Sequence, residues 1–332
     1  SYSWVSLMAA SSSTPSSRIS RFLARLLLFL LLLAAVDYGL GRVIDHFFRK
    51  TLYGENWSKE NWLLSRPYDV VCFGSSRTFR HYIPAIMQDS LGLSVFNAGA
   101  NGQYLYYAYA LEQLVLERYT PQVIVLDLLP NYVTKAESAE EELGRMSSLA
   151  PYASHPVVAG LLTSGKFNEK LKLRSRLYRY NSRLLSLAAN YFNQPGAMDN
   201  GFVYVGKSKF RPLHPFPDDL DENPAVVYDP ERIKVLKKFI RSAQEREIQV
   251  VLSFSPTATP LSPKIEEILS FYARLAQETG APFIKIVSAE HPRFYDQTLY
   301  SDLIHMNELG GRAFTPLFTA ELKKVLSGRH PL

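Results

Sequence analysis

Ser76 is the residue whose surroundings most clearly suit nucleophilic chemistry. It follows a short apolar run and the dipeptide Gly74-Ser75. A small residue at the end of a strand permits a sharp turn, and that turn presents the next hydroxyl at the start of a helix, where backbone N–H groups point outward. A serine nucleophile is held in this way. The same pattern also suits an ordinary helix cap or a phosphate-binding turn, so Ser76 alone leaves three interpretations open.

A base for a serine is available near the C-terminus, where Asp302 stands three residues before His305. An Asp at this spacing in a loop can accept the Nδ1 proton of the imidazole, fix its tautomer and leave Nε2 free to take a proton from a serine. The alternative is a surface pair that caps the last helix, with Asn307 as the N-cap. We expect His81 to pack on the first helix of the domain. No Asp stands at the same spacing before any of the other histidines, which are His46, His81, His155, His214, His291 and His330.

Two further segments carry hydrogen-bond donors just after apolar runs. The pattern Asn97-x-Gly99-x-x-Gly102 follows the run Leu93–Phe96, and Asn131 follows the run Val123–Leu128. A glycine N–H and an asparagine amide are donors that an oxyanion hole uses, where the loss of one donor costs about 3 kcal/mol of transition-state stabilisation. Each segment taken separately is only a turn.

A regular alternation of elements would bring these residues together. Strands of five or six residues that alternate with longer helices indicate parallel βαβ units. The predicted fold is therefore a doubly wound α/β sandwich with right-handed crossovers and with its chemistry at the carboxyl ends of the strands. Residues 133–229 break the alternation and are predicted to be an insertion. The expected strands are 68–73, 93–96, 123–128, 249–254 and 282–287, and the expected helices are 83–90, 104–119, 230–245, 263–278 and 307–326.

The N-terminal part of the chain differs from the rest in composition. A segment rich in Ser and Ala predicts disorder over residues 1–21, and residues 22–44 are apolar enough to form one transmembrane helix. A connector over 45–67 would then lead to the α/β domain. Because Arg18, Arg21 and Arg25 precede the apolar run, we expect a cytoplasmic N-terminus with the domain on the other side of the membrane. A cleaved signal peptide is the alternative.

Composition limits the remaining function classes. The 332 residues carry a formal charge of +6, and 47% are hydrophobic against 20% charged, which predicts a folded chain. The single cysteine, Cys72, excludes an intrachain disulfide and any Cys-rich metal site. A basic run over 166–183 suits contact with anionic headgroups, contact with an anionic polymer, or a solvated surface. No nucleic-acid motif accompanies it, and no metal or nucleotide cofactor is predicted.

In order and context these segments resemble the SGNH (GDSL-type) hydrolase family. Phe73-Gly74-Ser75-Ser76 resembles its first block, 97–102 its second, 127–131 its third and Asp302-x-x-His305 its fifth. The resemblance implies a flavodoxin-like three-layer α/β/α sandwich over residues 68–329. It also implies Ser76 as nucleophile, His305 as base and Asp302 as its orienting partner. The implied oxyanion donors are the Ser76 N–H, the Gly102 N–H and the Asn131 side chain.

Two departures from the family pattern point to a divergent branch. Ser75 stands where the family has Asp, and Leu129-Pro130 replaces the usual glycines before Asn131. A Gly-Ser-Ser-Arg block behind an N-terminal anchor resembles the branch that includes the D-alanyl transfer protein of teichoic acid operons and the alginate-acetylation proteins. That branch implies a serine esterase or O-acyltransferase outside the cytoplasm, in the periplasm or at the cell surface. Its substrate would be an acyl ester of cell-surface polysaccharide, and its partner a multi-pass membrane O-acyltransferase. A non-catalytic accessory or polymer-binding partner of such an enzyme is the alternative.

Overall fold

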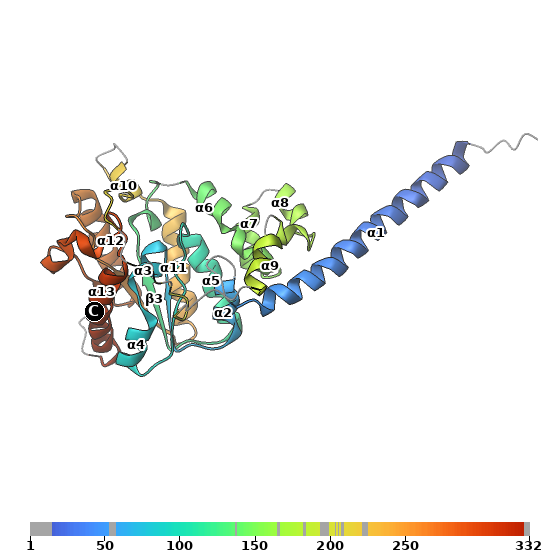
Figure 1. The fold of residues 1–332 in the computed structure, drawn as a ribbon. Helices are drawn as coiled ribbons and strands as arrows, with labels where there is room; N and C mark the ends of the chain where they lie inside the picture. Colours follow the sequence, from blue (N-terminus) through green and yellow to red (C-terminus); the bar gives the residue numbers. More distant parts are fainter. Residues whose placement is uncertain are drawn as a thin grey trace, which may run out of the picture.

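The computed structural model describes residues 15–328 except 53–57, 137, 165–166, 182–183, 193–198, 203, 205, 207–208 and 221–224. A long N-terminal helix, α1 (Pro15–Lys50), leads into an α/β domain (Figure 1). The prediction of disorder over residues 1–21 is wrong for Pro15–Arg21, which form the first turns of α1. Residues 1–14 lie outside the described residues. Proline is well tolerated in the first turn of a helix because its missing N–H would be unpaired there. The first six residues of the expected connector also belong to α1.

Helix α1 is long and apolar enough to cross a membrane. Every residue from Arg18 to Val36 is exposed. At about 1.5 Å per residue this stretch is about 28 Å long, which is close to the hydrocarbon thickness of a bilayer, about 30 Å. The length of this stretch suits one membrane span, but the predicted span over 22–44 extends beyond it, because Asp37 and Gly41 already contact the insertion. A signal sequence would share the same length and composition.

The centre of the domain is one sheet of five parallel strands, ordered β2-β1-β3-β4-β5. The parallel α/β sheet predicted from the alternation is therefore confirmed. Flavodoxin-like sheets have the same strand order, 2-1-3-4-5. The strands are β1 (Val70–Phe73), β2 (Val95–Asn97), β3 (Val123–Asp127), β4 (Gln249–Phe254) and β5 (Phe283–Lys285).

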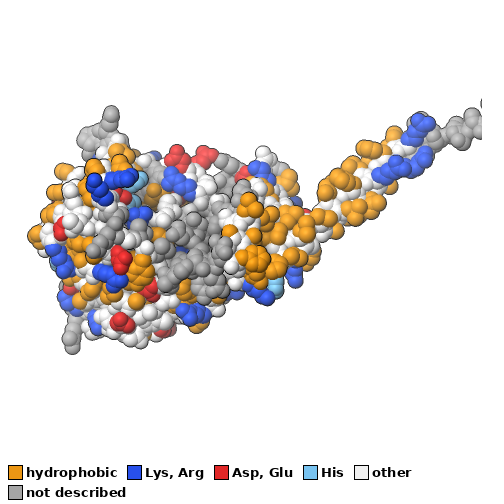
Figure 2. All heavy atoms as spheres, viewed as in Figure 1, with side chains coloured by type: hydrophobic (Ala, Val, Ile, Leu, Met, Phe, Trp, Pro, Cys, Tyr) orange, Lys and Arg blue, Asp and Glu red, His pale blue; other side chains and the backbone are white. Residues whose placement is uncertain are grey.

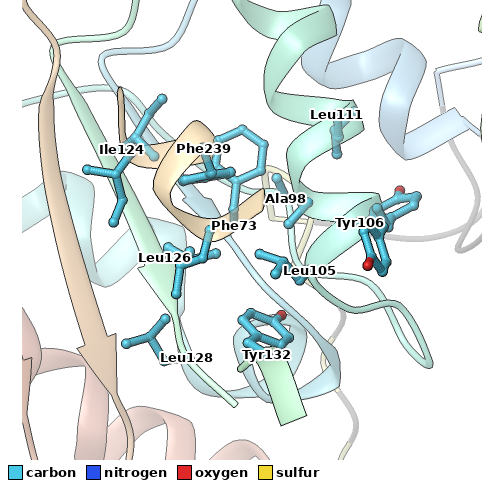
Figure 3. Packing of buried hydrophobic residues seen from close by; sticks show 14 of the residues in the cluster. Phe73, Ala98, Leu105, Tyr106, Leu111, Ile124, Leu126, Leu128, Tyr132 and Phe239 are labelled. Carbon is cyan, nitrogen blue, oxygen red and sulfur yellow. The ribbon is translucent and has the colours of Figure 1, made fainter. Parts of the chain in front are cut away.

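Helices cover both faces of the sheet because alternate strand residues point to opposite sides. On one face Phe73 packs edge to face on Phe239, with ring centroids 5.6 Å apart, and Leu126 joins the same core (Figure 3). On the other face Val70 and Cys72 pack in a second core. The first core contains α5 (Leu105–Arg118), α11 (Pro230–Gln244) and α12 (Pro263–Thr279), and the second contains α4 (Pro84–Leu91) and α13 (Glu308–Leu326).

The helices of the insertion between residues 139 and 192 lie on the side of the domain that α1 enters, whereas its helix at 217–220 lies beside α12 (Figure 1). The basic run over 166–183 does not form one helix, because the chain turns at 175–177 to hydrogen-bond with Asp37 of α1. The elements outside the sheet and its covering helices are α2 (Ser58–Ser65), α3 (Ser76–His81), η1 (Pro130–Tyr132), α6 (Ala139–Arg145), η2 (Met146–Tyr152), α7 (Pro156–Thr163), α8 (Phe167–Lys172), η3 (Tyr178–Tyr180), α9 (Leu184–Phe192), α10 (Pro217–Leu220), η4 (Pro292–Tyr295) and η5 (Gln297–Leu299).

Gly99 allows the loop after β2 to approach α3 very closely. A Cβ atom at this position would lie 2.4 Å from the backbone nitrogen of Phe79 and 2.9 Å from the carbonyl oxygen of Ser75. Both are backbone atoms, which cannot move aside as a flexible side chain can. The Gly99 carbonyl also accepts a hydrogen bond from the buried Lys59 of α2. The loop after β2 therefore fixes the position of α3, which begins at Ser76.

We expect Gly99→Ala to lower the free energy of unfolding by about 2 kcal/mol or more, because the added methyl group overpacks a backbone contact. Gly144→Ala is the matched control. Gly144 lies in α6 with no atom within 4 Å of its would-be Cβ, so this change should be neutral or stabilising by up to about 1 kcal/mol. Chemical denaturation of the two variants measures the difference, and equal unfolding midpoints would contradict the close approach.

Candidate active site

The turn between β1 and α3 places Ser76 at the carboxyl edge of the sheet. Gly74 has φ +146°, and a Cβ there would lie 2.1 Å from Oγ1 of Thr78, so only glycine fits this turn without displacement. Ser75 is the N-cap of α3, and its hydroxyl accepts a hydrogen bond from the N–H of Arg77 at 3.3 Å. The Ser75 side chain thus stabilises the helix that begins with Ser76.

Ser76, His305 and Asp302 form a hydrogen-bonded chain. The Oγ of Ser76 lies 2.6 Å from Nε2 of His305. On the other side of the ring, Nδ1 lies 2.8 and 2.9 Å from the two carboxylate oxygens of Asp302. An ionised carboxylate only accepts, so Nδ1 carries the ring proton and Nε2 is free to accept from the serine. The structure therefore brings together the three residues selected from the sequence as a catalytic triad.

The loop that carries Asp302 holds its carboxylate in the ionised form. Burial alone would raise the pKa of Asp302, but hydrogen bonds from the His305 ring and from the backbone N–H groups of Ile304 and His305 bring this pKa below its ordinary value. A charged carboxylate can stabilise an imidazolium, which is what a base needs when it takes a proton.

The imidazole of His305 is mostly shielded from water, with 12% of its side chain exposed. This burial lowers its pKa from the ordinary 6.5, and the positive charges of Arg80 and Arg77 act in the same direction. The hydrogen bond and charge of Asp302 oppose the shift without cancelling it. His305 is therefore neutral at pH 7 and able to act as a base.

Gly102 and Asn131 follow the two strands that flank β1. Gly102 is exposed in the turn before α5, with φ +65°, and Asn131 is fully buried in η1. Two backbone hydrogen bonds tie the Gly102 loop to β1 and its turn, from Ala98 to Cys72 at 2.8 Å and from Ala100 to Gly74 at 3.2 Å. Both residues thus stand at the same sheet edge as Ser76, while their roles as oxyanion donors stay predictions.

His81 has a role that the sequence did not indicate. It is fully buried at the end of α3, and its Nε2 accepts a hydrogen bond from the N–H of Met306, at 2.9 Å, directly after His305. Because Nε2 accepts, Nδ1 carries the proton and donates to Oγ of Ser255, 2.8 Å away. Burial and the charge of Arg77 place the pKa of His81 well below its ordinary value, which keeps the ring neutral. His81 is thus packed at the first helix of the domain, as expected, and its ring also fixes the backbone of the base loop to α3.

Arg77, the residue after the nucleophile, is a second buried tie. Its guanidinium donates to the hydroxyl of Ser255 at 2.7 Å and to the Ser255 carbonyl, and it lies 3.8 Å from the carboxylate of Asp127. Tyr82 donates to the same carboxylate at 2.6 Å. Since Asp127 ends β3 and Ser255 follows β4, this network joins the nucleophile turn to two strand ends. Ser255 was not selected from the sequence. Its position directly after the fourth strand, where polar residues of a site are expected, could have identified it.

His214 also reaches the site, from the last part of the insertion. Its ring centroid lies 5.9 Å from that of His305, and its backbone has φ +57°, a region that His adopts more readily than most residues. Backbone hydrogen bonds from Arg211 to Ser301 and from Leu303 to Leu213 fasten this segment to the base loop. No spacing in the sequence marks His214, because only the folded insertion brings it there.

Comparison with known proteins gives no support for or against a role of these residues, so the candidate site is described from its geometry alone. No family model matches the chain, and no curated protein matches it. Among the described residues, no three His, Cys, Asp or Glu side chains are grouped in a way that could hold a metal ion.

We expect His81→Phe to lower ester turnover at least tenfold although Ser76 and His305 are not substituted, because the loop that carries His305 loses its hydrogen bond to α3. Phenylalanine preserves the ring volume but leaves the buried N–H of Met306 without an acceptor, at a cost of about 1–3 kcal/mol. Steady-state kinetics on a chromogenic ester, corrected for the folded fraction, measures the effect. His291→Phe, which changes a histidine outside this network, should retain turnover. Full turnover per folded molecule of His81→Phe would contradict the positioning role.

The lowered pKa of His305 predicts the pH dependence of turnover. The base must be neutral, so activity falls as pH drops through the pKa of His305. Because that pKa lies below 6.5, the midpoint of the acid limb of kcat/KM should also lie below pH 6.5. A pH profile of the wild-type protein measures this midpoint. An acid limb centred above pH 7 would mean that a different group is the base.

Proposed function

We propose that the protein is a membrane-anchored serine esterase or O-acyltransferase that acts on acyl esters, acetyl or similar, of cell-surface polysaccharide. The observation that carries the proposal is the contact of 2.6 Å between Oγ of Ser76 and Nε2 of His305, with Asp302 on the other ring nitrogen. A serine hydroxyl activated by a neutral imidazole is the arrangement required for nucleophilic attack on an ester carbonyl. The proposed fold is the flavodoxin-like SGNH sandwich, which the parallel sheet and its strand order support.

The proposed reaction has two half-reactions. His305 takes the hydroxyl proton as Ser76 bonds to the ester carbonyl carbon, and the carbonyl oxygen becomes an oxyanion. The intermediate collapses when the C–O bond to the leaving alcohol breaks and His305 returns the proton to that alcohol, which leaves an acyl ester on Ser76. Water or a sugar hydroxyl then attacks this ester, with His305 again as base, and frees the serine.

Three donors are proposed for the oxyanion, namely the N–H of Ser76, the N–H of Gly102 and the side-chain amide of Asn131. Their positions after β1, β2 and β3, three neighbouring strands, support this assignment. Donors that are held in place before the reaction stabilise the transition state without reorganisation, which is usually the largest single catalytic contribution.

The setting of the reaction is proposed from α1 and from the first block. The three arginines before the apolar stretch favour a cytoplasmic N-terminus and an extracytoplasmic domain. The resemblance of Gly74-Ser75-Ser76-Arg77, behind an anchor, to the teichoic acid and alginate branch supports an acylated carbohydrate as substrate. It also supports a multi-pass membrane O-acyltransferase as partner, and transfer as well as hydrolysis.

Covalent labelling with a fluorophosphonate tests the nucleophile, because only an activated serine reacts rapidly. We expect wild-type protein to be labelled and Ser76→Ala to lose both labelling and ester turnover, the latter by about 10⁴-fold or more. His305→Ala should lose labelling as well. Ser75→Ala is the matched control: it removes the neighbouring hydroxyl and a helix cap, at about 1 kcal/mol of stability, but should keep the label.

Labelling that survives in folded Ser76→Ala would remove Ser76 from the role of nucleophile. A folded wild-type protein that is neither labelled nor active would favour the alternative, an accessory or polymer-binding partner of a membrane O-acyltransferase in which the triad is vestigial.

A further inference from the structure

A small basic pocket lies where α1 meets the insertion. Its volume is about 120 Å³. At about 30 Å³ per water molecule, this is room for one compact polar group and not for a sugar or an aromatic ring. The pocket is lined by Gly41, Asp45, Arg49, Pro151, Ser154, Arg176, Arg179 and Tyr180.

The two walls of the pocket are held together by specific contacts. Asp37 of α1 accepts hydrogen bonds from the Ser175 hydroxyl and from the backbone N–H groups of Arg176 and Leu177, at 2.5, 2.8 and 3.1 Å. One turn further along α1, a Cβ atom at Gly41 would lie 2.3 Å from Cβ of Arg176. A glycine inside a helix is otherwise unfavourable by about 0.5–1 kcal/mol relative to alanine. Here it allows the insertion to reach the helix, so the pocket is a fixed part of the junction.

Positive charge exceeds negative charge around this pocket: three guanidinium groups and the Asp45 carboxylate form its walls, and the Asp37 carboxylate lies beside it, bonded to the backbone of Arg176. The carboxylate of Asp45 is already engaged, by Arg49 at 2.9 Å and by the Tyr180 hydroxyl at 2.6 Å. Arg179 donates its Nε to the carbonyl of Leu173. Arg176 stacks on Tyr38, and in the described part of the chain no oxygen accepts a hydrogen bond from its guanidinium. The N–H donors that are left suit a small anion with several oxygens.

The pocket lies at the depth of lipid headgroups if α1 crosses a bilayer. Figure 2 shows hydrophobic side chains along the exposed length of α1 and basic ones at its far end. The uninterrupted apolar run ends at Val36, since Asp37 and Gly41 already contact the insertion, and Gly41 lies about 7.5 Å beyond Val36 along the axis. The headgroup layer is about 5–8 Å thick on each side of the hydrocarbon core. Three exposed basic residues precede, in the sequence, the segment that binds Asp37: Lys170, Lys172 and Arg174.

We propose that the pocket between α1 and the insertion binds the phosphate group of an anionic membrane lipid through Arg176, Arg179 and Arg49. The shared chemistry is a phosphate with free oxygens, and the position next to the end of the apolar stretch assigns its source to the membrane. A bound phosphate would accept hydrogen bonds from the guanidinium of Arg176 and offset the excess positive charge of the pocket. Lys170 and Lys172 would attract the anionic membrane surface. This inference goes beyond the proposed function: it shares the membrane anchor α1 with that proposal and is independent of the proposed catalysis.

Native mass spectrometry of the full chain in dodecyl maltoside tests the site. Three probes are added at equal concentration, namely dioleoyl phosphatidylglycerol, dioleoylglycerol and inorganic phosphate. We expect one phosphatidylglycerol to be retained at least tenfold more strongly than dioleoylglycerol, which has the same chains without phosphate. Arg176→Gln and Arg179→Gln should each lower this retention about tenfold. Arg176→Lys should restore part of it, since the charge and the side-chain stem are kept.

Arg241→Gln is the control for a loss of positive charge elsewhere, because Arg241 is exposed on α11. It should retain the lipid as the wild type does, and circular dichroism should verify that all variants are folded. Equal retention by wild type and folded Arg176→Gln would overturn the proposal. Equal retention of dioleoylglycerol, or displacement of the lipid by equimolar inorganic phosphate or by a polyanionic polysaccharide, would also overturn it. No arm measures ester turnover, so failure here is distinct from failure of the proposed function.

Discussion

The structure depends on one short contact between groups 229 residues apart in the chain, the hydroxyl of Ser76 and the imidazole of His305. A hydrogen bond of this length is lost if the two groups separate by about one ångström. Two buried ties prevent such movement. His81 connects α3 to the backbone after His305, and Arg77 connects the nucleophile turn to the residue after β4. The parallel sheet brings Ser76 to the carboxyl ends of its strands, and these two ties fix the position of Ser76 relative to His305.

Much of the scaffold follows from local signals in the sequence. Short β-branched runs such as Val70–Phe73 and Val123–Asp127 are buried on both faces of the sheet and stand out against the polar turns around them. Ser76 and Asn131, which follow such runs, lie at the same edge of the sheet because the parallel strands β1 and β3 end there. Asp302 and His305 are recognisable because a local spacing of three residues is sufficient to join them.

The residues that were not predicted act through contacts between distant segments. His81 is five residues from Ser76, but its partners are Met306 and Ser255, so no local spacing marks it. His214 reaches His305 only because the insertion returns to the base loop. The same holds for the docking of 175–177 on α1, which brings part of the basic run into contact with the N-terminal helix. Tertiary hydrogen bonds decide such features, and periodicity does not detect them.

The join between α1 and the domain also restricts where the catalytic centre can be. Helix α1 runs without a break to Lys50, and its C-terminal end is tied to α2. The side-chain amide of Asn61 donates hydrogen bonds to the carbonyl oxygens of Phe48 and Thr51. Phe48 is itself 1% exposed. A continuous helix that is tied to the domain in this way is a rigid connection and not a flexible linker. If α1 crosses a membrane as proposed, the Ser76 site would be held at a nearly constant height above the lipid surface, and only groups that reach this height could contact it.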